Sequence, residues 1–406
     1  MLPNSALFSI VHAFNPAQLT LARELRGLLK HELAERVGKS PSAIGQFENG
    51  RARPEPQTLL ALSLALGFPP VFFARTARAP VVAADSCQFR SQRSSSVREQ
   101  RYVLARGELL KELVTLLEAD HVDFPEARVP HAPGPVRGPE DVEACAELAR
   151  REMKLGEGPI GSMINELENI GVMVIPLDSD CRRVDAFSTW IARRPYIFLN
   201  SAKGSTSRAR FDAAHELGHL VMHPDVVPGS PELERQADQF ASAFLLPRTS
   251  FSKECPRRLN LQHLRELKVR WKVSLEALLY RGRELGFFSE ACVRRAYVQL
   301  NRLGLRRNEP DEPPEERPHL LPSALSALLE AGGTHAELAQ DMGISLQELV
   351  ALVEGRDLPD VVTRATTSLN GVQGEFTEFG LQKEAGAPSP MRDGTAHGGP
   401  KLVTEE

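Results

Sequence analysis

The sequence predicts a mostly α-helical chain with a small β-sheet, divided into an all-α N-terminal domain, an α+β central domain and a small C-terminal helical module. Apolar residues recur at helical spacing through most of the chain, and two proline-rich segments separate its parts. The 406 residues can form two or three domains with separate cores. Only three short runs, rich in β-branched and aromatic residues, indicate strands: 172–175, 186–191 and 196–199.

Shifts in composition mark the expected boundaries. Two proline-rich segments, 124–140 and 308–318, are typical of linkers, and the second is also acidic. The end of the chain is rich in Gly, Thr, Ser and charged residues without an apolar period, which is typical of disorder. We expect, in order, an all-α domain, a connecting helix, a linker, an α+β domain, a helical module and a disordered tail at residues 16–78, 97–123, 124–140, 140–300, 319–360 and 361–406.

The charge of the chain is unevenly distributed. Its net charge of −4 does not suit a general polyanion binder, but the first eighty residues hold nine Lys and Arg against five Glu. This local excess favours a nucleic-acid contact near the N-terminus. The five cysteines are scattered without a C-x-x-C, which predicts reduced thiols and argues against a thiolate zinc site. No signal-peptide pattern opens the chain and no apolar run suffices to cross a bilayer, so we expect a cytoplasmic protein without a membrane contact.

Four short helical patterns, separated by Gly and Pro, fill residues 16–74. Gly38 ends the second helix in the left-handed conformation that glycine allows. Ser40 caps the third helix, which has Pro41 in its first turn, and Pro54 begins the fourth. The small Ala34, then Gly38, then the apolar Ile44 have the spacing that two helices need to cross closely in a helix-turn-helix. The predicted core positions are apolar residues at helical spacing: Leu19, Leu25, Leu28, Leu33, Ala34, Val37, Ile44, Phe47, Leu59, Leu62 and Leu66.

The third of these helices and its surroundings carry the predicted DNA contacts. Short and amide side chains on its outer face can reach base edges, and nearby cations can hold phosphates. The predicted base contacts are Ser42, Gln46 and Asn49. The predicted phosphate contacts are Lys30, Lys39, Arg51 and Arg53. Two alternatives remain open: charges that are only solvated around a helical core, and a protein-interaction role for the same fold.

The run RGLLKHELAERVGKSPSAIGQFENGRARP closely resembles the Xre-type helix-turn-helix family, over roughly residues 16–74. The resemblance implies a homodimer that reads a palindromic operator in double-stranded DNA. Two positions depart from the family pattern. Leu29 stands where a Thr cap is usual, and Lys30 stands where Gln is usual. We therefore expect the second helix to be less well fixed and less base-specific.

The run RARFDAAHELGHLVMHP carries a second constellation. His215 and His219 are four residues apart on a helical segment, so both imidazoles can bind one ion, and Glu216 can act as general base on a metal-bound water. A following helical segment has Glu234 and Asp238 on one face, so one carboxylate can bind the metal while the other orients a liganding histidine. The alternative is a helix of buried structural histidines.

FDAAHELGHLVMH, followed by ELERQADQFASAFLLP, is similar to the ImmA/IrrE family of metallopeptidases over roughly residues 140–290. The whole arrangement is similar to fused Xre–ImmA proteins. This resemblance implies an α+β zincin-like (gluzincin-type) domain in which His215, His219 and Glu234 bind Zn²⁺ and Glu216 is the general base. Asp238 falls where the family often has Asn or Asp, and we expect it to orient a ligand.

Three further residues, His223, His263 and Tyr280, are candidates for stabilising an oxyanion or contacting substrate, and the sequence does not choose among them. For His223 the alternative is a partly exposed histidine at a helix end. Residues 320–358 weakly resemble another helix-turn-helix but are acidic, so we expect packing or dimerisation there rather than DNA contact.

Two functions are compatible with these patterns. The first is a DNA-binding transcriptional regulator with a zinc-dependent endopeptidase domain that cleaves a regulatory protein. The second is a transcription factor or antitoxin-like repressor in which the metallopeptidase-like domain is only a sensor or interaction module.

Overall fold

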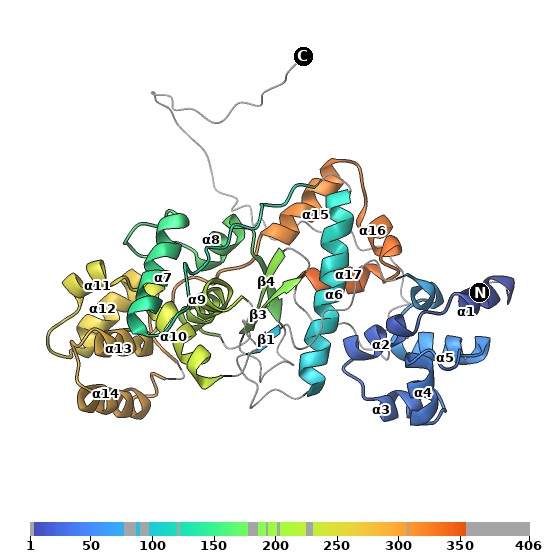
Figure 1. Ribbon diagram of the computed structural model, residues 1–406, viewed down its shortest axis with the longest axis horizontal. Coiled ribbons are helices and arrows are strands. Elements are labelled where there is room, and N and C mark those ends of the chain that lie inside the picture. Colours follow the sequence, from blue (N-terminus) through green and yellow to red (C-terminus); the bar gives the residue numbers. More distant parts are fainter. Residues whose placement is uncertain are drawn as a thin grey trace, which may run out of the picture. The chain divides into compact units, whose positions relative to one another are not determined.

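The computed structural model describes residues 4–76, 87–89, 97–119, 122–177, 186–191, 194–200, 204–224, 230–306 and 308–354 (Figure 1). They all belong to one unit of the chain, 1–364. The fold class predicted from the sequence is confirmed, since helices dominate and the described strands form a single small sheet. The predicted tail, 361–406, and the predicted end of the first domain at 78 lie outside the described residues.

The N-terminal helices bury the predicted apolar positions in one core, with Val37 packed at its margin. Gly38 has a φ of +63°, and the Ser40 hydroxyl accepts a hydrogen bond from the Ala43 amide at 3.2 Å, both as predicted. The last helix begins at Pro56 rather than at Pro54, because Glu55 is still extended. The elements are α1 Asn4–His12, α2 Pro16–Leu25, α3 Lys30–Arg36, α4 Pro41–Glu48, α5 Pro56–Leu66 and the 3-10 helix η1 Pro70–Ala74.

Helix α3 is capped in a way that the sequence pattern did not indicate. Leu29 has no polar side-chain atom to offer, but the Glu32 carboxylate accepts a hydrogen bond from the Leu29 amide at 2.6 Å. This bond lowers the pKa of Glu32. It supplies one half of a capping box, so the start of α3 is held despite the missing Thr.

The sheet separates two apolar cores. Its strand order is β1-β3-β4-β2, with β3 antiparallel to both neighbours and β2 parallel to β4. Alternate residues face opposite sides. Ile175 and Phe187 pack with the N-terminal and C-terminal helices, whereas Val174 and Ile197 pack with the histidine-bearing helix. The strands are β1 Cys87–Phe89, β2 Met173–Leu177, β3 Ala186–Ile191 and β4 Arg194–Asn200. Strand β1 was not predicted from the sequence.

The connecting helix predicted at 97–123 corresponds to α6, which spans Val97–Ala119. The segment after it, predicted to be a linker, is irregular but bound to the central domain, because the Arg128 and Ala132 amides donate to the carbonyls of Ile170 and Val221. None of the described helices combines the length and apolar content needed to cross a bilayer. The helices of this region are α6 Val97–Ala119, α7 Pro139–Glu152, α8 Met163–Asn169, α9 Thr206–Met222, α10 Pro231–Leu245, α11 Arg248–Glu254, α12 Leu261–Trp271, α13 Leu275–Glu284 and α14 Glu290–Arg302.

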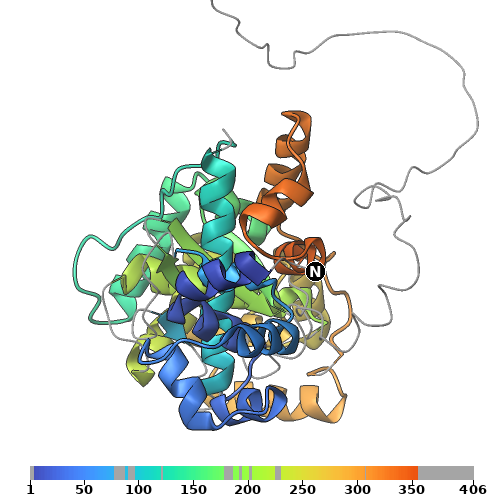
Figure 2. The ribbon, with the colours of Figure 1, turned by 90° about the vertical axis from the view of Figure 1, so that its right-hand side faces the viewer.

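The C-terminal module packs against α6 and the N-terminal core (Figure 2). Arg26, the residue directly after α2, forms a buried ion pair with Glu348, and Arg106 of α6 donates to the carbonyls of Ala351 and Leu352 at 3.1 Å. Thr334 caps its helix as a capping box with Glu337. These contacts are those of a packing module. The helices are α15 Leu320–Glu330, α16 His335–Asp341 and α17 Leu346–Glu354.

Residues 309–316, which we call the acidic strap, bind three helix N-termini of the central domain. Glu309 accepts from the Leu275 amide at 2.9 Å, Glu312 from the Ser207 amide at 2.9 Å, and Glu316 from the Ile164 amide at 3.0 Å. The N-terminal amides of a helix lack partners within it and carry partial positive charge, so carboxylates there are stabilising. The predicted second linker is therefore an ordered brace. One of the three helices that it binds, α9, carries the metal motif.

Glu312 provides a pH-dependent test of this brace. Burial alone would raise the pKa of Glu312, but hydrogen bonds from Lys268 and Ser207 outweigh it and hold the pKa below the usual 4.5. The ionised form therefore stabilises the fold fully above that pH, and the contribution is lost as pH falls through the lower folded pKa. We expect Glu312→Gln to lower the free energy of unfolding by about 1–2 kcal/mol at pH 7, with a smaller difference from wild type below pH 4.5 in denaturant titrations.

The matched control is Glu315→Gln, an exposed neighbour in the same strap that pairs only locally with Arg317. We expect little change from it. A loss of stability at Glu315 equal to that at Glu312 would contradict a specific role for the helix cap.

Candidate functional site

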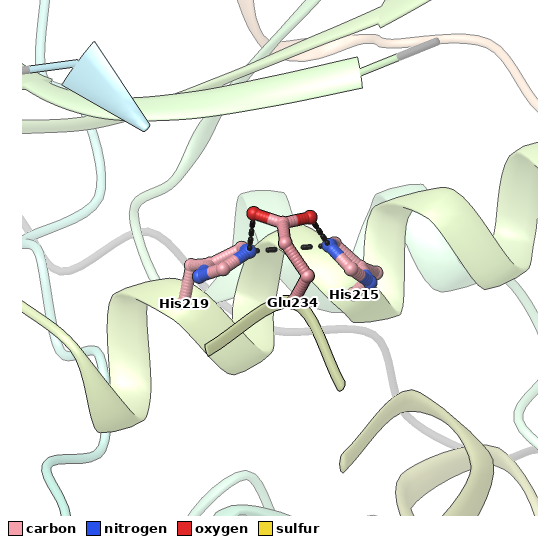
Figure 3. Close-up of side chains that lie close together, drawn as sticks. All are labelled: His215, His219 and Glu234. Atoms are coloured by element: carbon pink, nitrogen blue, oxygen red, sulfur yellow. Dashed lines mark hydrogen bonds and ion pairs between the residues drawn. The ribbon is translucent and has the colours of Figure 1, made fainter. Parts of the chain in front are cut away.

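The two central helices α9 and α10 lie side by side and supply the three predicted metal ligands (Figure 3). Glu234 Oε2 lies 3.5 Å from His215 Nε2, and Glu234 Oε1 lies 3.5 Å from His219 Nε2. The two Nε2 atoms are 3.1 Å apart. Both imidazoles are buried, and Glu234 is partly exposed. Side chains from two separate helices thus converge on one point.

Glycine at position 218 allows this approach. A Cβ atom there would lie 2.9 Å from Cδ1 and 3.1 Å from Cβ of Phe240, distances that packed carbon atoms do not tolerate. Phe240 is itself fully buried and stacks on Phe244 with ring centroids 5.5 Å apart. The close contact of α9 with α10 therefore depends on the missing side chain of Gly218, and it sets how near Glu234 comes to the histidines.

Hydrogen bonds at the rear of each ring determine the tautomer of both histidines. His215 Nδ1 lies 2.8 Å from Asp238 Oδ1, and because a carboxylate only accepts, this nitrogen carries the proton. The Asp238 contact therefore leaves a lone pair on His215 Nε2, the atom that faces Glu234. A second contact fixes His223: Gln236 Nε2 donates to the Val136 carbonyl and the Glu232 carboxylate, which leaves Gln236 Oε1 to accept from His223 Nε2 at 2.8 Å.

His223 fixes the tautomer of His219 in the same way. Burial lowers the pKa of His223, against a smaller opposing effect of its bond to Gln236, so its ring is neutral at neutral pH. With the proton on Nε2, His223 Nδ1 accepts from His219 Nδ1 at 3.2 Å. His219 Nε2 therefore also presents a lone pair. Two lone pairs and a carboxylate facing one another within 3.5 Å repel unless a cation lies among them, so the donor set fits a metal ion.

Glu216 follows the first histidine and points its carboxylate toward the sheet. It is fully buried, and its Oε2 accepts a hydrogen bond from the Ser188 hydroxyl of β3 at 2.7 Å. The same hydroxyl lies 3.4 Å from the Glu216 carbonyl oxygen. Sequence reasoning missed Ser188, although a polar residue inside a buried strand is the kind of signal that marks a hydrogen-bonded role.

The three candidates for oxyanion or substrate contact lie in different places. His223 is buried with both ring nitrogens hydrogen-bonded, so it is neither the partly exposed helix end nor a group directed at substrate, and it orients His219 instead. Tyr280 lies near Asp238, and burial raises its pKa. His263 lines a separate surface pocket with Arg258 and none of the three ligands.

The predicted DNA-contact residues form an exposed surface around α4. Three of the nine N-terminal cations form ion pairs within the protein: Arg23 with Glu48, Arg26 with Glu348 and Arg75 with Glu112. Lys30 is also engaged, with its Nζ 3.1 Å from Glu48, and is less available for phosphate than predicted. The remaining predicted contacts are all exposed: Lys39, Ser42, Gln46, Asn49, Arg51 and Arg53.

Comparison with known families agrees with both halves of this description. Residues 19–73 match the helix-turn-helix family, which indicates DNA-binding regulation. Residues 167–282 match the IrrE N-terminal-like domain, a metallopeptidase family, which indicates a peptidase-like domain with a metal. The chain matches no curated protein. The resemblance inferred from the motifs is confirmed: the chain joins a helix-turn-helix domain of the Xre type to an IrrE/ImmA-like domain.

Proposed function

We propose that this protein is a DNA-binding transcriptional regulator whose central domain is a zinc-dependent endopeptidase that cleaves a regulatory protein. The observation that carries the proposal is the convergence of His215, His219 and Glu234, with both imidazole lone pairs directed inward. Zinc bonds of about 2.0–2.1 Å at the tetrahedral angle would hold two ligand atoms about 3.3 Å apart. The observed separations of 3.1 and 3.5 Å match that requirement.

In this proposal His215, His219 and Glu234 would hold the zinc ion, which would supply Lewis-acid chemistry and lower the pKa of water at the site. Asp238 and His223 hold the imidazoles in the ligating tautomer. Ser188 holds the Glu216 carboxylate at Oε2. Glu216 accepts the water proton and delivers it to the leaving amine nitrogen. The family match and the buried carboxylate support this assignment.

Metal analysis tests the ligand set. We expect wild type to retain about one zinc ion per chain, and Glu234→Gln to weaken binding by more than about 100-fold, because the site loses its only negatively charged ligand. Asp238→Asn should weaken it by about 10–100-fold through the orientation of His215. Chelator competition followed by elemental analysis measures both.

Glu266→Gln, an exposed change on α12, is the control and should bind zinc like wild type. Unchanged zinc affinity in Glu234→Gln would show that Glu234 is not a zinc ligand.

Replacement of the general base separates chemistry from binding. Glu216→Gln keeps the size of the side chain but cannot take up the water proton, so we expect peptide hydrolysis to fall by at least about 100-fold. Zinc content and DNA affinity should stay as in wild type. Turnover of quenched fluorescent peptides, measured beside zinc content, gives the result. Hydrolysis at wild-type rate by Glu216→Gln would exclude the proposed mechanism.

The N-terminal half of the proposal is a homodimer on double-stranded operator DNA in the cytoplasm. The exposed side chains of Gln46 and Arg51 support the DNA contact. Leu60 and Leu64 are 40% and 72% exposed one turn apart on α5, an apolar pair that suits a second copy of the chain.

Salt titration tests the DNA contact. Loss of one phosphate contact in Arg51→Ala should weaken binding to a mixed-sequence duplex and reduce the slope of log affinity against log salt by about 1. Lys253→Ala, an exposed cation on α11, should change neither quantity. Fluorescence anisotropy across a salt series distinguishes the two, and equal effects of both substitutions would count against a specific surface on α4.

A second candidate function is a repressor in which the metallopeptidase-like domain only senses a metal, ligand or partner. One observation favours it: a face of the central sheet shares an apolar core with the N-terminal and C-terminal helices. A conformational change in the central domain would therefore alter the packing of the N-terminal helices. In that case Glu216→Gln leaves reporter output unchanged, whereas Arg51→Ala alters it.

A further inference from the structure

The shortest strand of the sheet comes from outside the central domain. β1, Cys87–Phe89, belongs to the part of the chain between η1 and α6, yet it pairs with β3 of the central domain. The strand order places β1 at one end of the sheet. Among the described residues, β1 alone therefore covers the outer edge of β3.

This edge belongs to the strand that contacts the general base. Gln88 of β1 is the register partner of Ser188, the residue whose hydroxyl binds Glu216 at 2.7 Å. Adjacent strands lie about 4.8 Å apart. The backbone of β1 therefore lies directly beside β3, the strand whose Ser188 binds the proposed catalytic carboxylate. Figure 3 shows the pale blue β1 and the pale green strand beside it on the side toward which the Glu234 carboxylate points.

A sheet edge presents a row of amide and carbonyl groups that pair with extended polypeptides of any sequence. We propose that the outer edge of β3 is the docking surface for extended peptides, and that the chain's own segment Cys87–Phe89 occupies it and keeps other peptides out. The part of this inference that concerns substrate rests on the proposed function.

The length and attachment of β1 suit a reversible occupant. Three residues of pairing are marginal on their own, because isolated short strands gain little from the ladder. Covalent attachment supplies an effective concentration in the millimolar range, which compensates for weak pairing. Because β1 is joined to the N-terminal domain on one side and to α6 on the other, a change in the N-terminal domain can withdraw it.

A proline in β1 tests the occupancy without requiring catalysis. Gln88→Pro removes a backbone donor and disfavours pairing at the centre of β1. With the full chain carrying Glu216→Gln to prevent turnover, we expect amide hydrogen exchange of residues 186–191 to become at least about tenfold faster. Ser94→Pro, in the same part of the chain but outside β1, is the matched control and should leave exchange unchanged. Unchanged exchange in Gln88→Pro would overturn the proposal.

A synthetic peptide with the sequence of residues 83–93, with Ser in place of Cys87, tests the docking surface in trans. We expect it to bind the Gln88→Pro chain at least about tenfold more tightly than the chain with native β1, and to restore protection of residues 186–191. The same peptide with Pro in place of Gln88 should not bind. Equal binding to both chains, or binding without renewed protection, would overturn the proposal.

Hydrolysis of an unrelated fluorescent peptide then separates this inference from the proposed function. With Glu216 restored and zinc supplied, Gln88→Pro should lower KM severalfold and leave kcat unchanged, because a competitor has been removed rather than a catalytic group altered. Absence of hydrolysis in every variant, together with the expected exchange and peptide binding, would refute the peptidase and retain the occupied edge. A KM unchanged by Gln88→Pro in an active enzyme would refute the occupied edge and retain the peptidase.

Discussion

The close contact between α9 and α10 is the constraint on which the rest of the centre depends. Neither helix contains all three candidate metal ligands, because His215 and His219 lie on α9 and Glu234 lies on α10. Gly218 and Phe240 allow the two backbones to approach at the level of the histidines. The partners behind the imidazoles also come from α10, since Asp238 and Gln236 belong to that helix. One helix pair therefore sets both the position and the protonation of the ligands.

The surroundings hold this pair from several directions. The acidic strap binds the N-terminus of α9 through Glu312, and Ser188 of β3 binds the carboxylate of Glu216. The opposite face of the sheet contributes to the core of the N-terminal and C-terminal helices. The candidate metal centre and the helix-turn-helix are thus parts of one packed arrangement, which gives a physical basis for coupling between the two domains.

Local patterns in the sequence predicted much of the fold. Glycine and capping residues act within a few positions of themselves, so Gly38 and Ser40 could be placed correctly without knowledge of distant contacts. The i, i+4 spacing of His215 and His219 implies a shared helix face for the same reason. The start of α5 was misplaced because two prolines, Pro54 and Pro56, offer equally good helix starts.

The sequence by itself determined the helix-turn-helix and the residue types that can bind a metal. Only the tertiary structure decided which hydrogen bonds fix the tautomers, which edge β1 joins, and that a proline-rich acidic segment is a brace rather than a linker. Those features arise from pairs of residues far apart in the chain, such as Ser207 with Glu312. Helical periodicity and capping depend only on residues that are neighbours along the sequence, so they cannot predict contacts between distant parts of the chain.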